Sequence, residues 1–242
     1  MSLSKNHIKL ITSLQQKKYR QKHKLFVAEG IKVVNELLNS SFECDKLFAT
    51  EAFDSSMVNA EVILISEIDL KKISQLKSPN KVLALFNIPE VQEKESSGLV
   101  LALDEINDPG NLGTIIRLCD WFGVTKLVCS KNTVDCYNQK VVQASMGSLT
   151  RVDIVYQDLI PFLNDAVSPS FIADMEGENV YTSKLPENAI LIMGNEANGV
   201  SKNVRDFVSS KISIPRFGNV KETESLNVAT ATAILLSEFK RG

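Results

Sequence analysis

Side chains able to do chemistry gather in three polar segments, each of which follows a short apolar run. The first segment, 108–117, reads DPGNLGTIIR. Six residues separate Asn111 from Arg117, which is under two helical turns, so both can face one side of a helix start. A guanidinium in such a place can clamp a phosphate or stabilise developing negative charge. The alternative is a helix cap followed by a solvent-facing arginine.

The second segment, 193–201, reads MGNEANGVS. Glycines on both sides of Glu196 indicate a tight turn at which the backbone can approach a ligand closely. Val200 stands where a phosphate-binding loop needs lysine, and the chain contains no G-x-G-x-x-G. A nucleotide triphosphatase is therefore disfavoured, and a dinucleotide-binding site is weakened. A purely structural turn is the alternative.

The third segment, 212–231, reads ISIPRFGNVKETESLNVATA and leads into an apolar terminal helix. Ser225 or Asn227 could cap that helix through its side-chain oxygen. Polar groups concentrated just before a buried helix can also hold the polar edges of a ligand.

Apolar runs alternate with helical patterns along the whole chain. Strands are expected at 26–28, 46–49, 62–65, 82–86, 99–103, 126–129, 152–155, 171–173, 190–193 and 211–214. Helices are expected at 31–38, 68–76, 114–122, 137–146, 159–163, 202–208 and 226–239. In the second series this alternation predicts a parallel sheet with helices on both faces, and ligands bind beyond the carboxyl ends of such strands. A polar stretch divides the chain into domains at 1–90 and 99–242, joined by a linker at 91–98.

Composition excludes several classes of protein. The chain has 242 residues, of which 44% are hydrophobic, and a formal net charge of -2, so it is not intrinsically disordered. No apolar run is long enough to span a membrane, and the N-terminus lacks the features of a secretory signal, which predicts a cytoplasmic protein. Four cysteines without a C-x-x-C pair and two histidines argue against a metal site or a disulfide framework.

The N-terminal 28 residues are basic, with seven Lys or Arg and no acidic residue. Clustered cations bind a nucleic-acid backbone by releasing its counterions, and an aromatic ring among them offers a stacking surface. A solvated basic helix face is the alternative. The candidate RNA-binding residues are Lys17, Lys18, Tyr19, Arg20, Lys22 and Lys24.

Together the three polar segments resemble the signature of the SpoU (TrmH-type) branch of the SPOUT RNA methyltransferases. The matching patterns are D-P-G-N-L-G-x-x-x-R, M-G-N-E-x-x-G and I-P…E-S-L-N-V-A-x-A, with Q-A-S-M-G-S at 143–148 between the first two. The N-terminal block, with S-L-Q-x-K-K-Y-R and F-V-A-E-G, resembles the substrate-binding domain that often precedes it, which is similar to ribosomal, kink-turn-binding proteins. The loop 217–224 is longer than is usual in close relatives.

The resemblance implies a parallel sheet with a deep trefoil knot, bound S-adenosylmethionine, and a homodimer with the site at the subunit interface. The implied reaction is methylation of a ribose 2′-hydroxyl, in large-subunit rRNA more than in tRNA, with no metal. The implied catalytic residues are Asn111, Arg117, Glu196, Ser225 and Asn227, with Arg117 also contacting the RNA. The resemblance offers Arg117 as the base for the ribose hydroxyl, and the alternative is that it clamps a phosphate and stabilises the developing alkoxide. The implied donor-binding residues are Met193, Gly194, Gly199, Ile214, Leu226 and Asn227.

Two other functions remain open at this point. An RNA-binding or ribosome-assembly module could keep this fold without catalysis, although Asn111, Arg117 and Asn227 are all present. A nucleotide-dependent oxidoreductase on a doubly wound sheet is more remote because its glycine fingerprint is missing.

Overall fold

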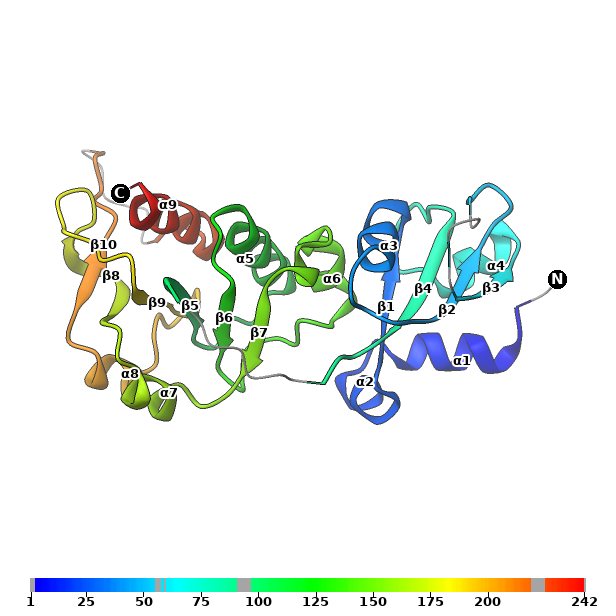
Figure 1. Ribbon diagram of the computed structural model, residues 1–242, viewed down its shortest axis with the longest axis horizontal. Coiled ribbons are helices and arrows are strands. Elements are labelled where there is room, and N and C mark those ends of the chain that lie inside the picture. The colour runs from blue at the N-terminus through cyan, green and yellow to red at the C-terminus, as the bar shows by residue number, and fades with distance from the viewer. Residues whose placement is uncertain (1–2, 55–57, 59, 91–96, 219–224, 242) are drawn as a thin grey trace. The chain divides into compact units, whose positions relative to one another are not determined.

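The computed structural model describes residues 3–54, 58, 60–90, 97–218 and 225–241. The chain divides into two compact units (Figure 1). One comprises Met1–Val91 together with Asp135–Thr150, and the other Gln92–Val134 together with Arg151–Gly242. The segment Asp135–Thr150 thus packs with the N-terminal unit, although the sequence division assigns it to 99–242. The expected linker lies almost entirely outside the described residues.

The N-terminal unit is built on a mixed four-stranded sheet of order β1-β4-β2-β3. Strand β4 is antiparallel to both β1 and β2, whereas β3 is parallel to β2. The strands are β1 (Leu25–Glu29), β2 (Cys44–Ala49), β3 (Glu61–Leu64) and β4 (Val82–Asn87). The helices are α1 (Lys5–Ser13), α2 (Lys17–His23), α3 (Ile31–Leu38), α4 (Glu67–Ile73) and α6 (Gln139–Ser145), followed by a short 3-10 turn at Ser148–Thr150. Every residue of β1 is buried, so both faces of this sheet are covered.

Arg20 holds the segment Asp135–Thr150 against α2. Its guanidinium is 2.9 Å from the carbonyl oxygens of Leu14 and Gln15, and its Nε and Nη2 donate to Oδ2 of Asp135 at 2.9 and 2.5 Å. Arg20 is only 2% exposed. The expectation that Arg20 contacts RNA is therefore wrong, because its hydrogen-bonding groups are buried and satisfied within the protein.

Loss of this buried pair is expected to destabilise the N-terminal unit. Replacing Arg20 by Met leaves the Asp135 carboxylate without its partner, which costs about 3 to 5 kcal/mol in comparable buried pairs. Chemical denaturation of the variant measures this loss. Replacing the exposed Lys22 of the same helix by Met is the matched control and should change stability by no more than about 0.5 kcal/mol. Equal stabilities of the two variants would contradict the prediction.

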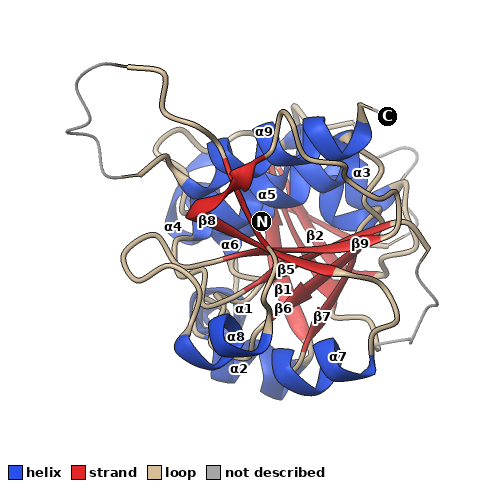
Figure 2. Cartoon of the chain, turned by 90° about the vertical axis from the view of Figure 1, so that its left-hand side faces the viewer, coloured by secondary structure: helices blue, strands red, loops and turns tan. Residues whose placement is uncertain are grey.

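The C-terminal unit contains the predicted parallel sheet, of order β10-β8-β9-β5-β6-β7. Its strands are β5 (Leu99–Leu103), β6 (Lys126–Cys129), β7 (Asp153–Tyr156), β8 (Ser170–Asn179), β9 (Ala189–Met193) and β10 (Lys211–Ser213). Helices α5 (Pro109–Trp121) and α9 (Val228–Lys240) lie on one side of this sheet, and α7 (Leu159–Asp165) and α8 (Lys202–Phe207) on the other (Figures 1 and 2). The central strands β5 and β9 are buried throughout, which explains their unbroken apolar sequences.

Two of the predicted elements have an end that differs by more than three residues from its predicted position, and helices α1 and α2 are not among the predicted elements. Helix α5 begins at Pro109, five residues before the expected Thr114, because Asp108 caps it and proline suits the first helical position. Strand β8 continues to Asn179 instead of ending at Ala173. Its second half is polar because it pairs only with β10, whereas its first residues pair with the buried β9.

Candidate functional site

The start of α5 fixes the position of Asn111. Oδ1 of Asp108 accepts a hydrogen bond from the backbone N–H of Asn111 at 2.8 Å, in the geometry of a helix N-cap. Pro109 lacks an N–H, so the first helical position has no donor that needs a partner. Asn111 therefore projects from a rigid helix start that follows the carboxyl end of β5.

Three of the residues selected from the sequence form one hydrogen-bonded cluster. Nδ2 of Asn227 donates to Oδ1 of Asn111 at 3.0 Å, and Nδ2 of Asn111 donates to Oε1 of Glu196 at 2.6 Å. Oδ1 of Asn227 in turn accepts from the N–H groups of Ala229 and Thr230, so this residue also caps α9. The cluster thus joins the loops after β5 and β9 to the start of α9, and α5 and α9 pack against each other.

Two further residues, not selected from the sequence, hold the loop that carries Glu196. Asn195 exchanges two backbone hydrogen bonds with Gly199, and its Nδ2 donates to the carbonyl of Glu105 at 2.8 Å. Asp104 is 4% exposed, and its Oδ2 accepts from the N–H of Ser201 at 2.8 Å. The loop after β9 is therefore tied at both ends to the loop after β5. The only sequence signal was their place directly after buried strands.

The loop after β5 is itself held in an unusual conformation. Glu105 has a φ of 58°, a region that a residue with a side chain seldom occupies. Its N–H donates to Oγ of Ser130 at 2.9 Å, and its Oε1 accepts from Nδ2 of Asn132 at 2.8 Å. These contacts from the loop after β6 stabilise the strained backbone and aim the Glu105 carbonyl at Asn195.

Gly194 has no room for a side chain. A Cβ placed there would lie 2.2 Å from the backbone nitrogen of Val200 and 2.3 Å from the carbonyl carbon of Gly199. The glycine therefore lets the two ends of the loop touch, as the sequence suggested, but what approaches it is the chain itself. The preceding Met193 is buried, and its carbonyl accepts from the N–H of Asp104 at 2.9 Å.

Ile214 and Leu226 are the remaining residues that the sequence predicts to bind the methyl donor. Leu226 is 48% exposed, and Ile214 follows the end of β10 half-buried. No hydrogen bond joins the backbone N–H or C=O of either residue to another residue that the structure describes. An apolar surface beside open backbone groups matches a flat heterocycle with polar edges. The longer loop expected at 217–224 lies largely outside the described residues.

Arg117 and Ser225 do not join the cluster of Asn111, Glu196 and Asn227. Both side chains are exposed, Arg117 on α5 and Ser225 before the start of α9. Within the described ranges Arg117 makes no hydrogen bond or ion pair. Its guanidinium is therefore available to a ligand.

The predicted RNA-binding residues of the N-terminal unit lie on α2 or directly after it. Lys17, Lys18, Lys22 and Lys24 are exposed. Nζ of Lys18 lies 4.9 Å from the ring centroid of Tyr19, which also stacks on His23. Apart from the buried Arg20, the predicted RNA-binding residues of this unit are thus exposed lysines with the half-buried Tyr19 among them, whereas Arg117, the remaining predicted RNA-binding residue, lies on α5 of the other unit.

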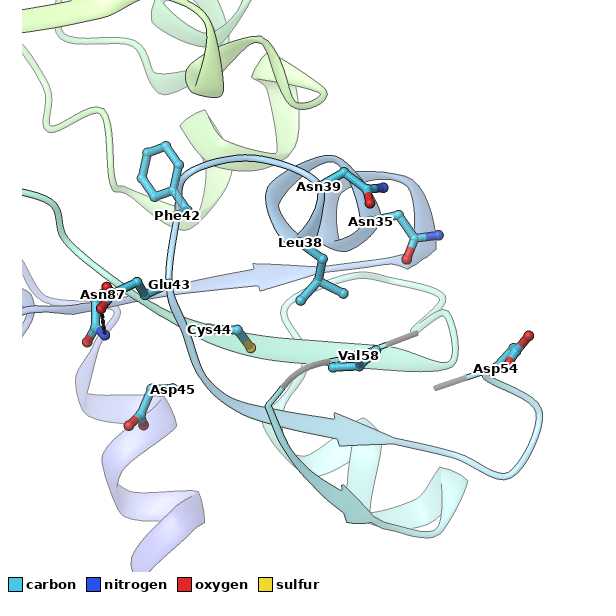
Figure 3. Close-up of a pocket in the computed structure, with 10 residues that line it drawn as sticks. All are labelled: Asn35, Leu38, Asn39, Phe42, Glu43, Cys44, Asp45, Asp54, Val58 and Asn87. Carbon is cyan, nitrogen blue, oxygen red and sulfur yellow. Dashed lines mark hydrogen bonds between the residues drawn. The ribbon is translucent and has the colours of Figure 1, made fainter. Parts of the chain in front are cut away.

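A separate hollow of about 880 Å³ lies in the N-terminal unit (Figure 3). It is lined by Asn35, Leu38, Asn39, Phe42, Glu43, Cys44, Asp45, Asp54, Val58 and Asn87. Burial, and secondarily the charge of Asp45, raises the pKa of the Cys44 thiol to about 11, so the thiol stays protonated at neutral pH. The hollow contains none of the residues selected from the sequence, and its three carboxylates disfavour RNA phosphates.

The described ranges contain neither a helix that could span a membrane nor a cluster of side chains that could bind a metal. None of the helices in them is long and apolar enough to cross a bilayer. No group of three or more His, Cys, Asp or Glu side chains there could hold a metal ion.

Comparison with known proteins decides the family. The model of the SpoU rRNA Methylase family matches residues 98–237, which is more than half of the chain. The chain belongs to the SpoU rRNA methylase family. Residues 5–84 match the MRM3-like substrate binding domain, so the expected SpoU domain and substrate-binding domain are both confirmed.

Several relatives of this SpoU family chain match it over nearly its full length. The 23S rRNA (guanosine(2553)-2'-O)-methyltransferase RlmP of Bacillus subtilis is 28% identical, covering 94% of this chain and 93% of RlmP. A solved structure of a TrmH-family protein from Porphyromonas gingivalis is 38% identical, with a TM-score of 0.90, covering 100% of this chain and 99% of that one. An rRNA methyltransferase from Sinorhizobium meliloti, solved with bound AdoMet, is 28% identical with a TM-score of 0.85, covering 100% and 96%.

Proposed function

We propose that this SpoU family methyltransferase transfers a methyl group from S-adenosylmethionine to a ribose 2′-hydroxyl of large-subunit (23S) rRNA. The observation that carries the proposal is the hydrogen-bonded cluster of Asn111, Glu196 and Asn227, which unites the three family motifs at the carboxyl edge of the parallel sheet. The names of RlmP and of the AdoMet-bound relative support the reaction and the RNA.

The proposed catalytic residues act by positioning and by charge. S-adenosylmethionine supplies the transferable methyl group, whose displacement from sulfur needs neither a metal nor a covalent enzyme intermediate. Arg117 presents a planar guanidinium with several N–H donors and no acceptor, so it clamps an RNA phosphate and stabilises the developing alkoxide. Asn111 fixes one carboxylate oxygen of Glu196. The other oxygen, which no described residue binds, can orient the ribose hydroxyl and accept the proton that this hydroxyl loses on methylation. Ser225 and Asn227 orient the reactants from the start of α9.

The proposed donor site lies in the loops after β9 and β10 and before α9. Ile214 and Leu226 contact the adenosine through open backbone groups and apolar side chains. Gly194 and Gly199 allow the two ends of the loop after β9 to lie in contact. Met193 joins the start of this loop to Asp104, and Asn227 caps α9 beside the donor. A trefoil knot around this site is part of the proposal, and the match to the SpoU family supports it.

The proposed RNA-binding surface comprises Lys17, Lys18, Tyr19, Lys22 and Lys24 of the N-terminal unit. Replacing Lys17, Lys18 and Lys22 together by Gln should weaken rRNA binding and flatten its salt dependence. The slope of log K against log salt concentration falls by about 0.7 to 0.9 for each phosphate that the protein no longer neutralises. Filter binding across a salt series measures the slope. Lys71→Gln, an exposed lysine on α4, is the control, and an unchanged slope in the triple variant would remove this surface from the proposal.

The proposed enzyme is a cytoplasmic homodimer that needs no metal. Arg117 is exposed and unengaged within the described residues, which suits a site completed by a second subunit. Trp121, one helical turn further along α5, is 84% exposed, and a large exposed indole is typical of a subunit contact. Mixed dimers of Arg117→Ala and Asn227→Ala subunits test this arrangement, because a shared site restores part of the activity that each variant lacks.

Methyl transfer with labelled S-adenosylmethionine tests the proposed reaction. Unmodified 23S rRNA and tRNA are offered separately, and the product is digested to nucleosides. We expect label on 23S rRNA alone, in one 2′-O-methyl nucleoside. Label on tRNA alone would overturn the rRNA assignment. Tight donor binding with no label on either RNA would favour a non-catalytic RNA-binding module.

A further inference from the structure

An exposed aromatic pair lies outside the residues discussed so far. Phe217 is 81% exposed and Tyr181 is 37% exposed, with ring centroids 6.2 Å apart and planes inclined by 33°. Next to Phe217, Nη2 of Arg216 lies 3.4 Å from the sulfur of Met175, which is itself exposed. Adjacent exposed apolar side chains of this size mark a binding surface more often than a structural contact.

The pair occupies the edge of the sheet at which the chemistry is proposed. Tyr181 follows the end of β8 by two residues, and Phe217 follows the end of β10 by four. These strands are parallel neighbours, so both rings lie at the carboxyl edge that also carries Asn111 and Glu196. Phe217 is three residues beyond Ile214, the proposed donor contact. A group that binds to these two rings would therefore lie at the same edge of the sheet as the proposed reaction, where the RNA substrate binds.

The chemistry of the patch selects a nucleobase rather than a phosphate. Every base has a π-face that stacks on aromatic rings, and an arginine guanidinium adds a planar cation that stacks equally well. Strand β8, which Tyr181 follows, also carries the exposed Glu176 and Glu178, whose negative charge disfavours a phosphate at this end of the sheet. A nucleobase carries no net charge, so the carboxylates of Glu176 and Glu178 do not repel it from the aromatic rings.

We propose that Tyr181, Arg216 and Phe217 form a stacking site for a nucleobase of the RNA substrate, close to the nucleotide whose ribose is methylated. This inference rests on the proposed function, since it identifies how the same site holds its RNA. It assigns the recognition of a base to the C-terminal unit, whereas the lysines of α2 contact the backbone of the RNA.

The test compares Phe217→Ala with Phe217→Trp in the full-length protein. Unmodified 23S rRNA transcript is the probe in filter binding and in methyl transfer. Loss of the ring should weaken rRNA binding about tenfold at every salt concentration, with an unchanged salt slope, because a stacking contact releases no counterion. The affinity for S-adenosylmethionine and the dimer mass should stay the same. The Trp variant should bind rRNA as wild type does.

A matched control and four outcomes complete the test. Val167→Ala removes another fully exposed apolar side chain of the same unit and should change nothing. Unchanged rRNA affinity in Phe217→Ala overturns the stacking site. Loss of donor binding would assign the ring to the donor pocket, and loss of the dimer would assign it to a subunit contact; either result also overturns it. If wild type binds rRNA but transfers no methyl group, the proposed function fails while the binding data still decide the stacking site.

Discussion

Replacing Arg117 by Ala is expected to lower the rate of methyl transfer about 10²- to 10³-fold, the usual cost of removing one group that stabilises transition-state charge. The affinity for S-adenosylmethionine should not change, because the proposed donor contacts are backbone groups after β9 and β10 and before α9. The guanidinium is exposed and makes no hydrogen bond or ion pair within the described residues, so its removal should leave the fold intact. Single-turnover transfer to 23S rRNA and calorimetric titration of the donor measure the two quantities.

Two further variants sharpen this experiment. Lysine keeps the charge but lacks the planar fork, so Arg117→Lys should recover only part of the rate. Lys240→Ala removes an exposed cation from α9 in the same unit and should behave as wild type. Normal turnover in Arg117→Ala would rule out a catalytic role. Loss of donor binding would show that Arg117 shapes the donor pocket instead.

A methyl group added at Gly194 is expected to disable the donor site. The Cβ of Gly194→Ala would lie 2.2 Å from the backbone nitrogen of Val200, and backbone on both sides cannot yield as a flexible side chain would. The loop must open, which costs about 1 to 3 kcal/mol in overpacked sites and weakens donor binding about ten- to a hundredfold. Titration with S-adenosylmethionine measures the affinity.

The control for this variant lies in the same loop. Ala197 is exposed, and Ala197→Ser adds one atom to it without meeting the chain. It should therefore bind the donor as wild type does. Donor affinity unchanged in Gly194→Ala would show that the loop after β9 can open without affecting the donor site, and Gly194 would then have only a folding role.

Much of the fold could be predicted from local pattern because the C-terminal sheet is buried on both faces. Leu99–Leu103 and Lys126–Cys129 are strands with the bounds expected, since an unbroken apolar run between polar loops leaves little choice. The predicted start of α5 is five residues too late, because the first turn of this helix is polar and contains Pro109 and Gly110. A cap at Asp108 was the signal that could have corrected it.

The residues of the candidate site could be predicted from the sequence, but the residues that hold their loops in place could not. Asn111, Glu196 and Asn227 were found through motifs, and the structure joins them by hydrogen bonds. Asn195 was missed because an asparagine in a turn is common and its partner, the carbonyl of Glu105, has no sequence signature. The positive φ of Glu105 is equally invisible, since it depends on contacts made by Ser130 and Asn132 far along the chain.

The placement of Asp135–Thr150 limits how this protein can be divided or recombined. The segment lies between β6 and β7 in the chain, yet it supplies Asp135 to Arg20, Gln139 to Glu29 and Tyr137 to the ring of Phe26. A fragment cut at the expected linker would be missing all three partners and would expose the surface that they cover. A chimera that exchanges the substrate-binding domain between family members must therefore carry residues 135–150 with it, because the N-terminal unit is built from two separate stretches of the chain.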